Sequence, residues 1–100
     1  MVIFILYIEF TPDNRGVIMP EVSRFYGIVI KLFFSGNPPA HFYAIHNEHV
    51  GMFDIATGHM VEGDLSELSC SMIKAWADLH KQPLNKMWLR EQIEPLPPLQ

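Results

Sequence analysis

Cysteine is almost missing from this chain: Cys70 is the single one among 100 residues. It can form no internal disulfide, and the sequence contains no Cys-x-x-Cys pair of the kind that binds zinc. Chains with so little cysteine are typical of a reducing compartment, and we expect a cytoplasmic location. Cys70 lies in a helical pattern, where we expect a small packed side chain.

Positive charge is also scarce, with seven Lys and Arg residues against eleven Asp and Glu residues and a formal net charge of −4. A nucleic-acid-binding protein needs a basic face to collect phosphates, so the composition argues against nucleic acid as a partner. Long apolar runs are missing too, because Met1 to Phe10 is too short to cross a bilayer and lacks the basic start of a signal peptide. We therefore expect no membrane partner.

Motifs for familiar chemistry are lacking as well. The sequence shows no phosphate loop, no nucleotide fingerprint, no Ser-His-Asp arrangement and no His-Glu-x-x-His motif. No cofactor is expected on this basis.

Residues 1–18 are interpreted as an N-terminal extension, with three alternatives left open: an edge strand, a disordered tail, or sequence upstream of the natural start. Met19 begins the run Met-Pro-Glu-Val-Ser-Arg-Phe, which is typical of a protein start. We predict that Met19 is the biological start, that residues 19–96 form a single domain, and that residues 97–100 form a Pro-rich tail.

What the chain does contain is a series of short apolar runs separated by turn residues. Such runs predict strands joined in an antiparallel meander. The predicted strands are Phe25 to Phe34, His41 to His46, His49 to Ile55 and Met60 to Glu62.

A helical pattern follows the last predicted strand. Asp64 is predicted as its N-cap, with Glu67 three residues later in a capping-box pair. The expected buried stripe is Leu65, Leu68, Met72, Trp76 and Leu79. Pro83 is expected to break or kink the helix before a second helical piece from Leu84 to about Glu91. The fold class is thus α+β: a small antiparallel β-meander of about four strands with one long C-terminal helix packed on one face.

The candidate site comes from the register of the second and third predicted strands. A two-residue turn at Asn47-Glu48 would place His41 directly opposite Asp54, with Tyr43 two residues further along the same face. A carboxylate there would orient the imidazole and favour its charged form. His41, Asp54 and Tyr43 are therefore the candidate catalytic residues, although no nucleophile is clearly placed beside them. The alternatives are a metal or ligand site, and a buried hydrogen bond that only holds the strand end.

Two further histidines, His46 and His49, flank the predicted turn. Two neighbouring imidazoles can bind a metal, so His46 and His49 join His41 as candidate metal ligands. The simpler alternative is that they are solvated turn residues.

Several blocks of the sequence carry a family resemblance in the right order. They are Met19 to Ile28, Asn37 to Ala44, Phe53 to Gly58, Glu62 to Leu65, Ala75 to His80 and Ile93 to Leu96. Through them the chain resembles a small prokaryotic family catalogued as domain of unknown function number 4160. That family commonly carries histidines where this chain has Asn37 and Tyr43, so only His41 of the cluster is kept, and the family usually continues helically at Pro83.

The resemblance implies a gene that forms one half of a two-gene module, beside another small protein, in a toxin–antitoxin-like arrangement. One helix also cannot cover both faces of the predicted sheet, so exposed aromatics such as Phe33, Phe42 or Trp88 would mark an interaction surface. We therefore expect a cytoplasmic interaction protein that pairs with a second small protein or with itself. The alternative is a small metal-binding protein or enzyme centred on His41 and Asp54.

Overall fold

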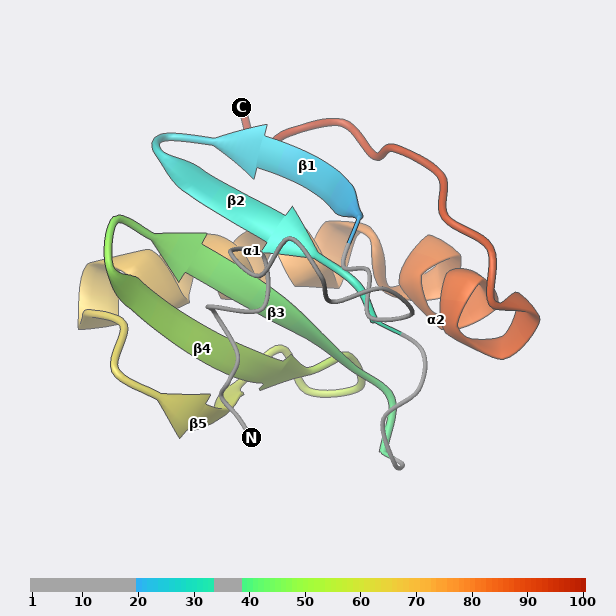
Figure 1. The fold of residues 1–100 in the computed structure, drawn as a ribbon, viewed down its shortest axis with the longest axis horizontal. Coiled ribbons are helices and arrows are strands. Elements are labelled where there is room, and N and C mark those ends of the chain that lie inside the picture. Colours follow the sequence, from blue (N-terminus) through green and yellow to red (C-terminus); the bar gives the residue numbers. More distant parts are fainter. Residues whose placement is uncertain (1–19, 34–38) are drawn as a thin grey trace, which may run out of the picture.

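A computed structural model describes residues 20–33 and 39–100 of the chain. These residues form an α+β fold with a five-stranded antiparallel sheet in the order β1-β2-β3-β4-β5, followed by two helices (Figure 1). The strands are β1 (Glu21–Phe25), β2 (Ile28–Lys31), β3 (His41–His46), β4 (His49–Asp54) and β5 (Met60–Gly63). The helices are α1 (Glu67–Leu79) and α2 (Lys81–Arg90). The predicted fold class is confirmed, with one more strand than expected.

The additional strand arises where a single strand from Phe25 to Phe34 was expected. Tyr26 and Gly27 have φ angles of 49° and 80°, so both lie in the left-handed region. Two consecutive residues of that kind make the tight turn whose twist matches a β-hairpin. The apolar run is therefore folded back on itself, and β1 pairs with β2 across this turn. The residues 34–38 of the expected strand and loop lie outside the described residues.

The register of β3 and β4 is the one that the sequence predicts. Asn47 takes the left-handed conformation, with a φ of 58°, at the turn between the two strands. From there the pairing runs from His46 opposite His49 to His41 opposite Asp54. Because side chains alternate along a strand, this register decides which residues face the helices.

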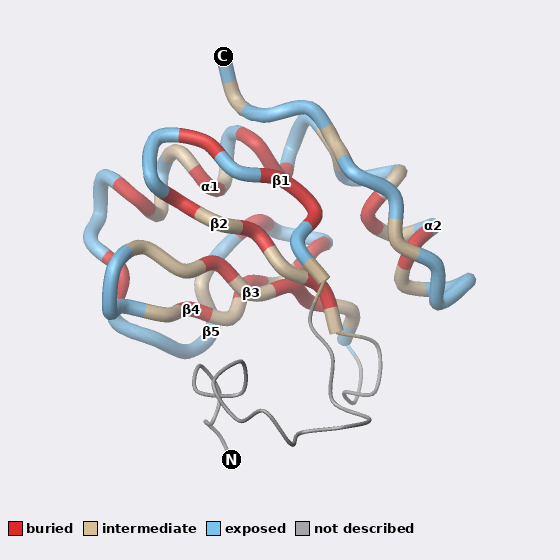
Figure 2. Tube along the Cα trace, turned by 45° about the horizontal axis from the view of Figure 1, so that its top comes forward, coloured by how far each residue is buried: buried red, intermediate tan, exposed pale blue. Residues whose placement is uncertain are grey.

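The core lies between the sheet and the helices: α1 packs behind one face of the sheet, and α2 lies beside the sheet at the ends of its strands (Figures 1 and 2). Trp76 of α1 is fully buried, and its ring lies 5.8 Å from that of Phe25 and 5.7 Å from that of Phe42. Phe42 stacks on Phe53 at 5.4 Å. Phe42 was expected as an exposed marker of an interaction surface, and that prediction is wrong, because the β3 register turns its side chain into the core.

The predicted start of the first helix is wrong. The N-cap is Ser66, whose hydroxyl accepts a hydrogen bond from the backbone N–H of Ser69. Asp64 is unavailable for this role because its carboxylate accepts from the Val50 backbone and bonds to His49. The sequence alone did not distinguish between two residues that are both favoured at N-caps.

The predicted buried stripe of the helix is also wrong in part. The residues of α1 that are buried are Ser69, Ile73, Trp76 and Ala77. Leu68 and Leu79 keep 69 % and 70 % of their surface exposed. The helix therefore carries more apolar surface than the sheet can cover.

The helical region is divided at His80, where the C-cap of α1 has a φ of −117° and α2 follows directly. Pro83 lies in the first turn of α2, where its missing N–H breaks no intrahelical hydrogen bond. One long helix is thus two shorter ones, and the second begins three residues before the predicted Leu84.

Residues 91–100, which we call the C-terminal strap, run back beside β1 (Figure 1). The backbone N–H of Leu96 donates to the carbonyl of Val22 at 2.8 Å, and the indole of Trp76 donates to the carbonyl of Pro97 at 2.9 Å. The predicted Pro-rich tail, residues 97–100, is therefore tied to the core through Pro97 and Leu99.

The extension 1–18 and the predicted start at Met19 lie outside the described residues. In the part of the chain that is described, no helix is long and apolar enough to span a bilayer.

Candidate functional site

The side of the sheet away from the helices is called here the outer face. Its centre is formed by side chains on β2, β3 and β4 that are half-buried: Val29, Tyr43, Ile45, Val50 and Met52. Val29 lies opposite Ile45, which in turn lies opposite Val50. Neither α1 nor α2 crosses this surface (Figure 1). The outer face therefore combines apolar side chains at its centre with incomplete burial.

His41 and Asp54 lie at one end of the outer face as direct cross-strand partners. Their polar atoms, however, have different hydrogen-bond partners. Asp54 accepts from the backbone N–H of Ala56 at 2.9 Å, in the turn after β4. His41 Nδ1 lies 2.9 Å from the carbonyl oxygen of Pro39. The carboxylate therefore does not orient the imidazole as expected, since each of the two side chains has a local backbone group as its hydrogen-bond partner.

The surroundings of His41 restrict its chemistry. A carbonyl oxygen only accepts, so Nδ1 carries the hydrogen and the lone pair of the neutral ring is on Nε2. The side chain is 7 % exposed, and the ring of Trp88 from α2 lies 4.9 Å away. Tyr43 packs edge-on against the same ring at 5.6 Å. The imidazole of His41 is therefore packed between β3 and α2, where it covers the end of the core.

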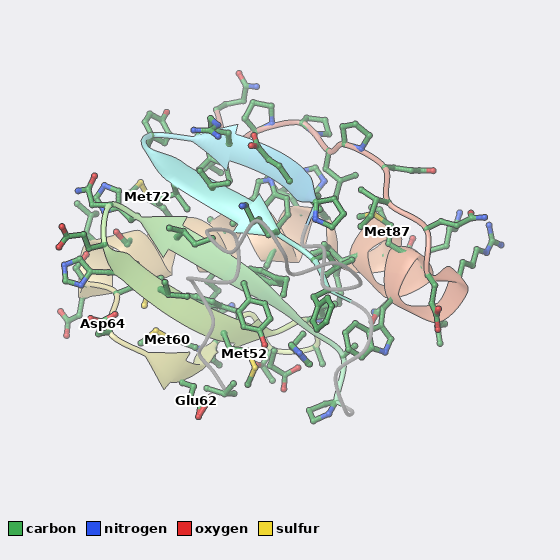
Figure 3. The ribbon with its side chains drawn as sticks, viewed as in Figure 1. Met52, Met60, Glu62, Asp64, Met72 and Met87 are labelled. Atoms are coloured by element: carbon green, nitrogen blue, oxygen red, sulfur yellow. The ribbon has the colours of Figure 1, made fainter. Side chains whose placement is uncertain are left out.

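Tyr43 shares the outer face with Glu62, across the intervening Met52. Met52 and Glu62 are labelled in Figure 3. Burial raises the pKa of the Tyr43 phenol, and the negative charge of Glu62 raises it further. The phenol is therefore neutral at physiological pH and acts as a hydrogen-bonding group rather than as a base.

The three candidate metal ligands are not brought together. His46 and His49 flank the turn at one end of β3, whereas His41 begins the strand at the other end, roughly 17 Å away for five residues of strand. His46 packs beside Gly27 of the neighbouring hairpin, and His49 bonds to Asp64. Within residues 20–33 and 39–100, no group of three His, Cys, Asp or Glu side chains is arranged to hold a metal ion.

The contact between His49 and Asp64 was missed by sequence reasoning. Nδ1 of His49 lies 2.9 Å from a carboxylate oxygen of Asp64, fifteen positions away. This ion pair raises the pKa of His49 and lowers that of Asp64. The other carboxylate oxygen accepts from the backbone of Val50, so Asp64 ties the chain after β5 to the start of β4 (Figure 3). No local sequence pattern predicts a contact between two residues this far apart in the chain.

A shallow pocket of about 370 Å³ opens between β5 and α1, lined in part by His59, Met60 and Cys70. The thiol of Cys70 lies 3.9 Å from the sulfur of Met60. Burial, together with the nearby charge of Glu67, raises the pKa of the thiol. Cys70 is thus a protonated packing residue rather than an activated nucleophile.

Comparison with known protein families gives a match. The family model described as a domain of unknown function, DUF4160, matches residues 27–89, which span β2 to α2. The chain belongs to this family. No curated protein and no solved structure matches it significantly. The match covers the whole β3–β4 ladder and the first helix, so strands β2 to β5 and the apolar centre of the outer face lie within the DUF4160 region, whereas β1 precedes it.

Proposed function

We propose that this DUF4160 protein is an interaction component that binds a second small protein through the outer face of its sheet. In this proposal it acts in a prokaryotic cytoplasm, as one half of a two-gene, toxin–antitoxin-like module. The observation that carries the proposal is the one-sided arrangement of the helices. α1 packs behind the sheet and α2 lies at the ends of the strands, so within the described residues the apolar centre of the outer face has no helix over it.

The composition of the outer face supports a protein as its ligand. Protein interfaces typically have an apolar centre surrounded by a polar rim. Here Val29, Ile45 and Val50 form the centre. The rim is polar. Arg24 and Glu21 form an ion pair of 2.8 Å on β1, and Glu62 lies on β5 at the opposite edge of the sheet.

A small-molecule or metal site at His41 has weaker support. Its Nδ1 is already bonded to Pro39, and the Asp54 carboxylate is bonded to the Ala56 backbone. A group that performs general acid–base chemistry must reach the reacting proton, and the ring of His41 is enclosed by Trp88 and Tyr43.

The proposal is tested by co-expressing the full chain with the product of the adjacent gene. We expect a stoichiometric complex on size-exclusion chromatography with light scattering. Ile45→Lys places a charge at the centre of the outer face and should abolish the complex while the far-UV circular dichroism stays unchanged. Val61→Lys is the matched control, because Val61 is 54 % exposed on β5 and lies outside the apolar centre.

Two results would overturn the proposal. One is the failure of the adjacent gene product to bind the folded chain. The other is a complex that withstands Ile45→Lys as well as it withstands Val61→Lys.

A further inference from the structure

One flank of α1 carries apolar side chains that the sheet leaves exposed in whole or in part. They are Leu68, Met72, Ala75 and Leu79, of which Met72 packs in part against the core, and we call them the flank stripe. Leu68 and Leu79 are 69 % and 70 % exposed, Ala75 is exposed, and Met72 is half-buried. At 3.6 residues per turn the four lie within an arc of roughly 60°, about a third of a turn from the buried face of the helix.

The spacing of the flank stripe is that of a helix–helix seam. Its members are separated by four, three and four residues, the pattern by which side chains of paired helices interlock. Isolated apolar residues on a surface are ordinary, whereas a continuous apolar line at this spacing is suited to another helix. The stripe extends over about 16 Å of helix, at 1.5 Å per residue.

The order of residues in the stripe indicates which helix fits it. The pairs Leu68 with Leu79 and Met72 with Ala75 share one midpoint, between positions 73 and 74 of α1. An antiparallel copy of α1 related by a two-fold axis at this midpoint would place Leu68 on Leu79 of the second copy. The same operation places the long Met72 side chain against the short Ala75. A surface that is its own complement under a two-fold axis is what a symmetric dimer requires.

Charge favours the same arrangement. Glu67 directly precedes the stripe, and Lys81 follows its last residue by two positions. In the antiparallel pair, Glu67 of one copy lies level with His80 of the other, next to Lys81 at the start of α2, and the two helix dipoles oppose each other favourably. A parallel pair would instead place Glu67 beside Glu67.

We infer that the flank stripe of α1 is a docking surface for a second copy of this chain, which pairs its own α1 antiparallel across a two-fold axis. This surface is separate from the outer face of the sheet. The dimer leaves that outer face accessible on each subunit. The seam is short, so its buried area is below that of a standard stable interface, and the dimer is concentration-dependent.

The test is sedimentation velocity of the full chain over a concentration series. We expect a monomer–dimer equilibrium. Leu79→Lys should raise the dimer Kd by about tenfold or more, because it places a charge against the apolar seam. Leu89→Lys is the matched control, since Leu89 is 79 % exposed on α2 and outside the stripe. It should leave the Kd unchanged.

A charge exchange tests the orientation. Glu67→Lys alone should weaken the dimer, and addition of Lys81→Glu should restore it, a rescue that a role in folding alone would not produce. A chain that stays monomeric at all concentrations, or a dimer that tolerates Leu79→Lys, would overturn the inference. The outcome is distinguishable from that of the proposed function, because Leu79→Lys should leave capture of the adjacent gene product intact and Ile45→Lys should leave the dimer intact.

Discussion

Trp76 and Pro97 lie twenty-one positions apart, and the indole Nε1 of the first donates a 2.9 Å hydrogen bond to the carbonyl oxygen of the second. This bond joins the C-terminal strap to α1, and the hydrogen bond from Leu96 to Val22 joins the strap to β1 at the edge of the sheet. The strap thus covers the β1 edge, so β5 is the edge that stays open among the described strands.

Removal of the indole donor should destabilise the fold. In Trp76→Phe the carbonyl of Pro97 loses its partner and a fully buried site loses volume, so we expect a loss of about 2 kcal/mol. Urea unfolding followed by circular dichroism measures it. Trp88→Phe is the control: Trp88 is half-buried and the smaller loss expected there is below about 1 kcal/mol. Equal losses for the two variants would contradict the role given to the hydrogen bond.

The His49–Asp64 pair should make stability depend on pH within a defined window. The pKa of His49 is raised above 6.5, so its contribution is complete below that pH and disappears as pH rises through the raised value. The pKa of Asp64 is lowered below 3.8, so its contribution is complete above that pH and disappears as pH falls through the lowered value. The pair therefore stabilises between these limits.

Thermal melts of wild type and His49→Gln across pH measure this effect. The difference in Tm should be largest between the ordinary pKa values of the two groups, 3.8 and 6.5, and should disappear as pH rises through the raised pKa of His49. Both side chains are exposed, so the difference should also shrink in about 1 M salt. A difference in Tm that is independent of pH would show that the ion pair is not its cause.

Gly51 provides the space that Met60 and Leu65 occupy beneath the sheet. A Cβ atom at this position would lie 2.8 Å from the Met60 sulfur and 2.9 Å from a Leu65 methyl carbon. Gly51→Ala should therefore destabilise the protein by about 1 to 3 kcal/mol through overpacking. The same substitution in a Met60→Ala background should have a smaller effect, and a double-mutant cycle by urea unfolding measures the coupling. Additive effects would contradict the steric explanation.

The Cys70 thiol should be slow to react. Burial and the charge of Glu67 raise its pKa, so little thiolate is present near neutral pH. Reaction with Ellman's reagent should be much slower in the native protein than in urea, and Glu67→Gln should accelerate the native reaction modestly. Equal rates in the two states would contradict the protection described here.

The first helix should depend on Ser66 rather than on Asp64 for its cap. Ser66→Ala should destabilise the protein by about 1 kcal/mol, because the N–H of Ser69 loses its acceptor. Asp64→Ala should also destabilise, but its effect should depend on the presence of His49, whereas that of Ser66→Ala should not. Melts of the single and double variants with His49→Gln distinguish the two residues.

The sequence by itself determined the features that depend on neighbouring residues. The turn at Asn47 and the alternation of side chains along β3 and β4 were sufficient for the register, including His41 opposite Asp54. The family membership was likewise readable, because it rests on blocks of residues in the sequence itself. The division of the helical region near Pro83 was also readable, because the effect of a proline on a helix is local, as is strand pairing across a short turn.

Only the tertiary structure decided the rest. The hairpin turn at Tyr26 and Gly27 lies inside an apolar run in which Gly27 is the only turn residue, and a single glycine in a strand pattern fits a bulge as well as a turn. The distant His49 engages Asp64 and so leaves Ser66 as the N-cap of α1. The way α1 lies on the sheet decides which of its leucines are buried. His41 donates its hydrogen bond to the carbonyl of Pro39 rather than to Asp54. Cross-strand register places two backbones side by side but does not determine which partner each side chain reaches.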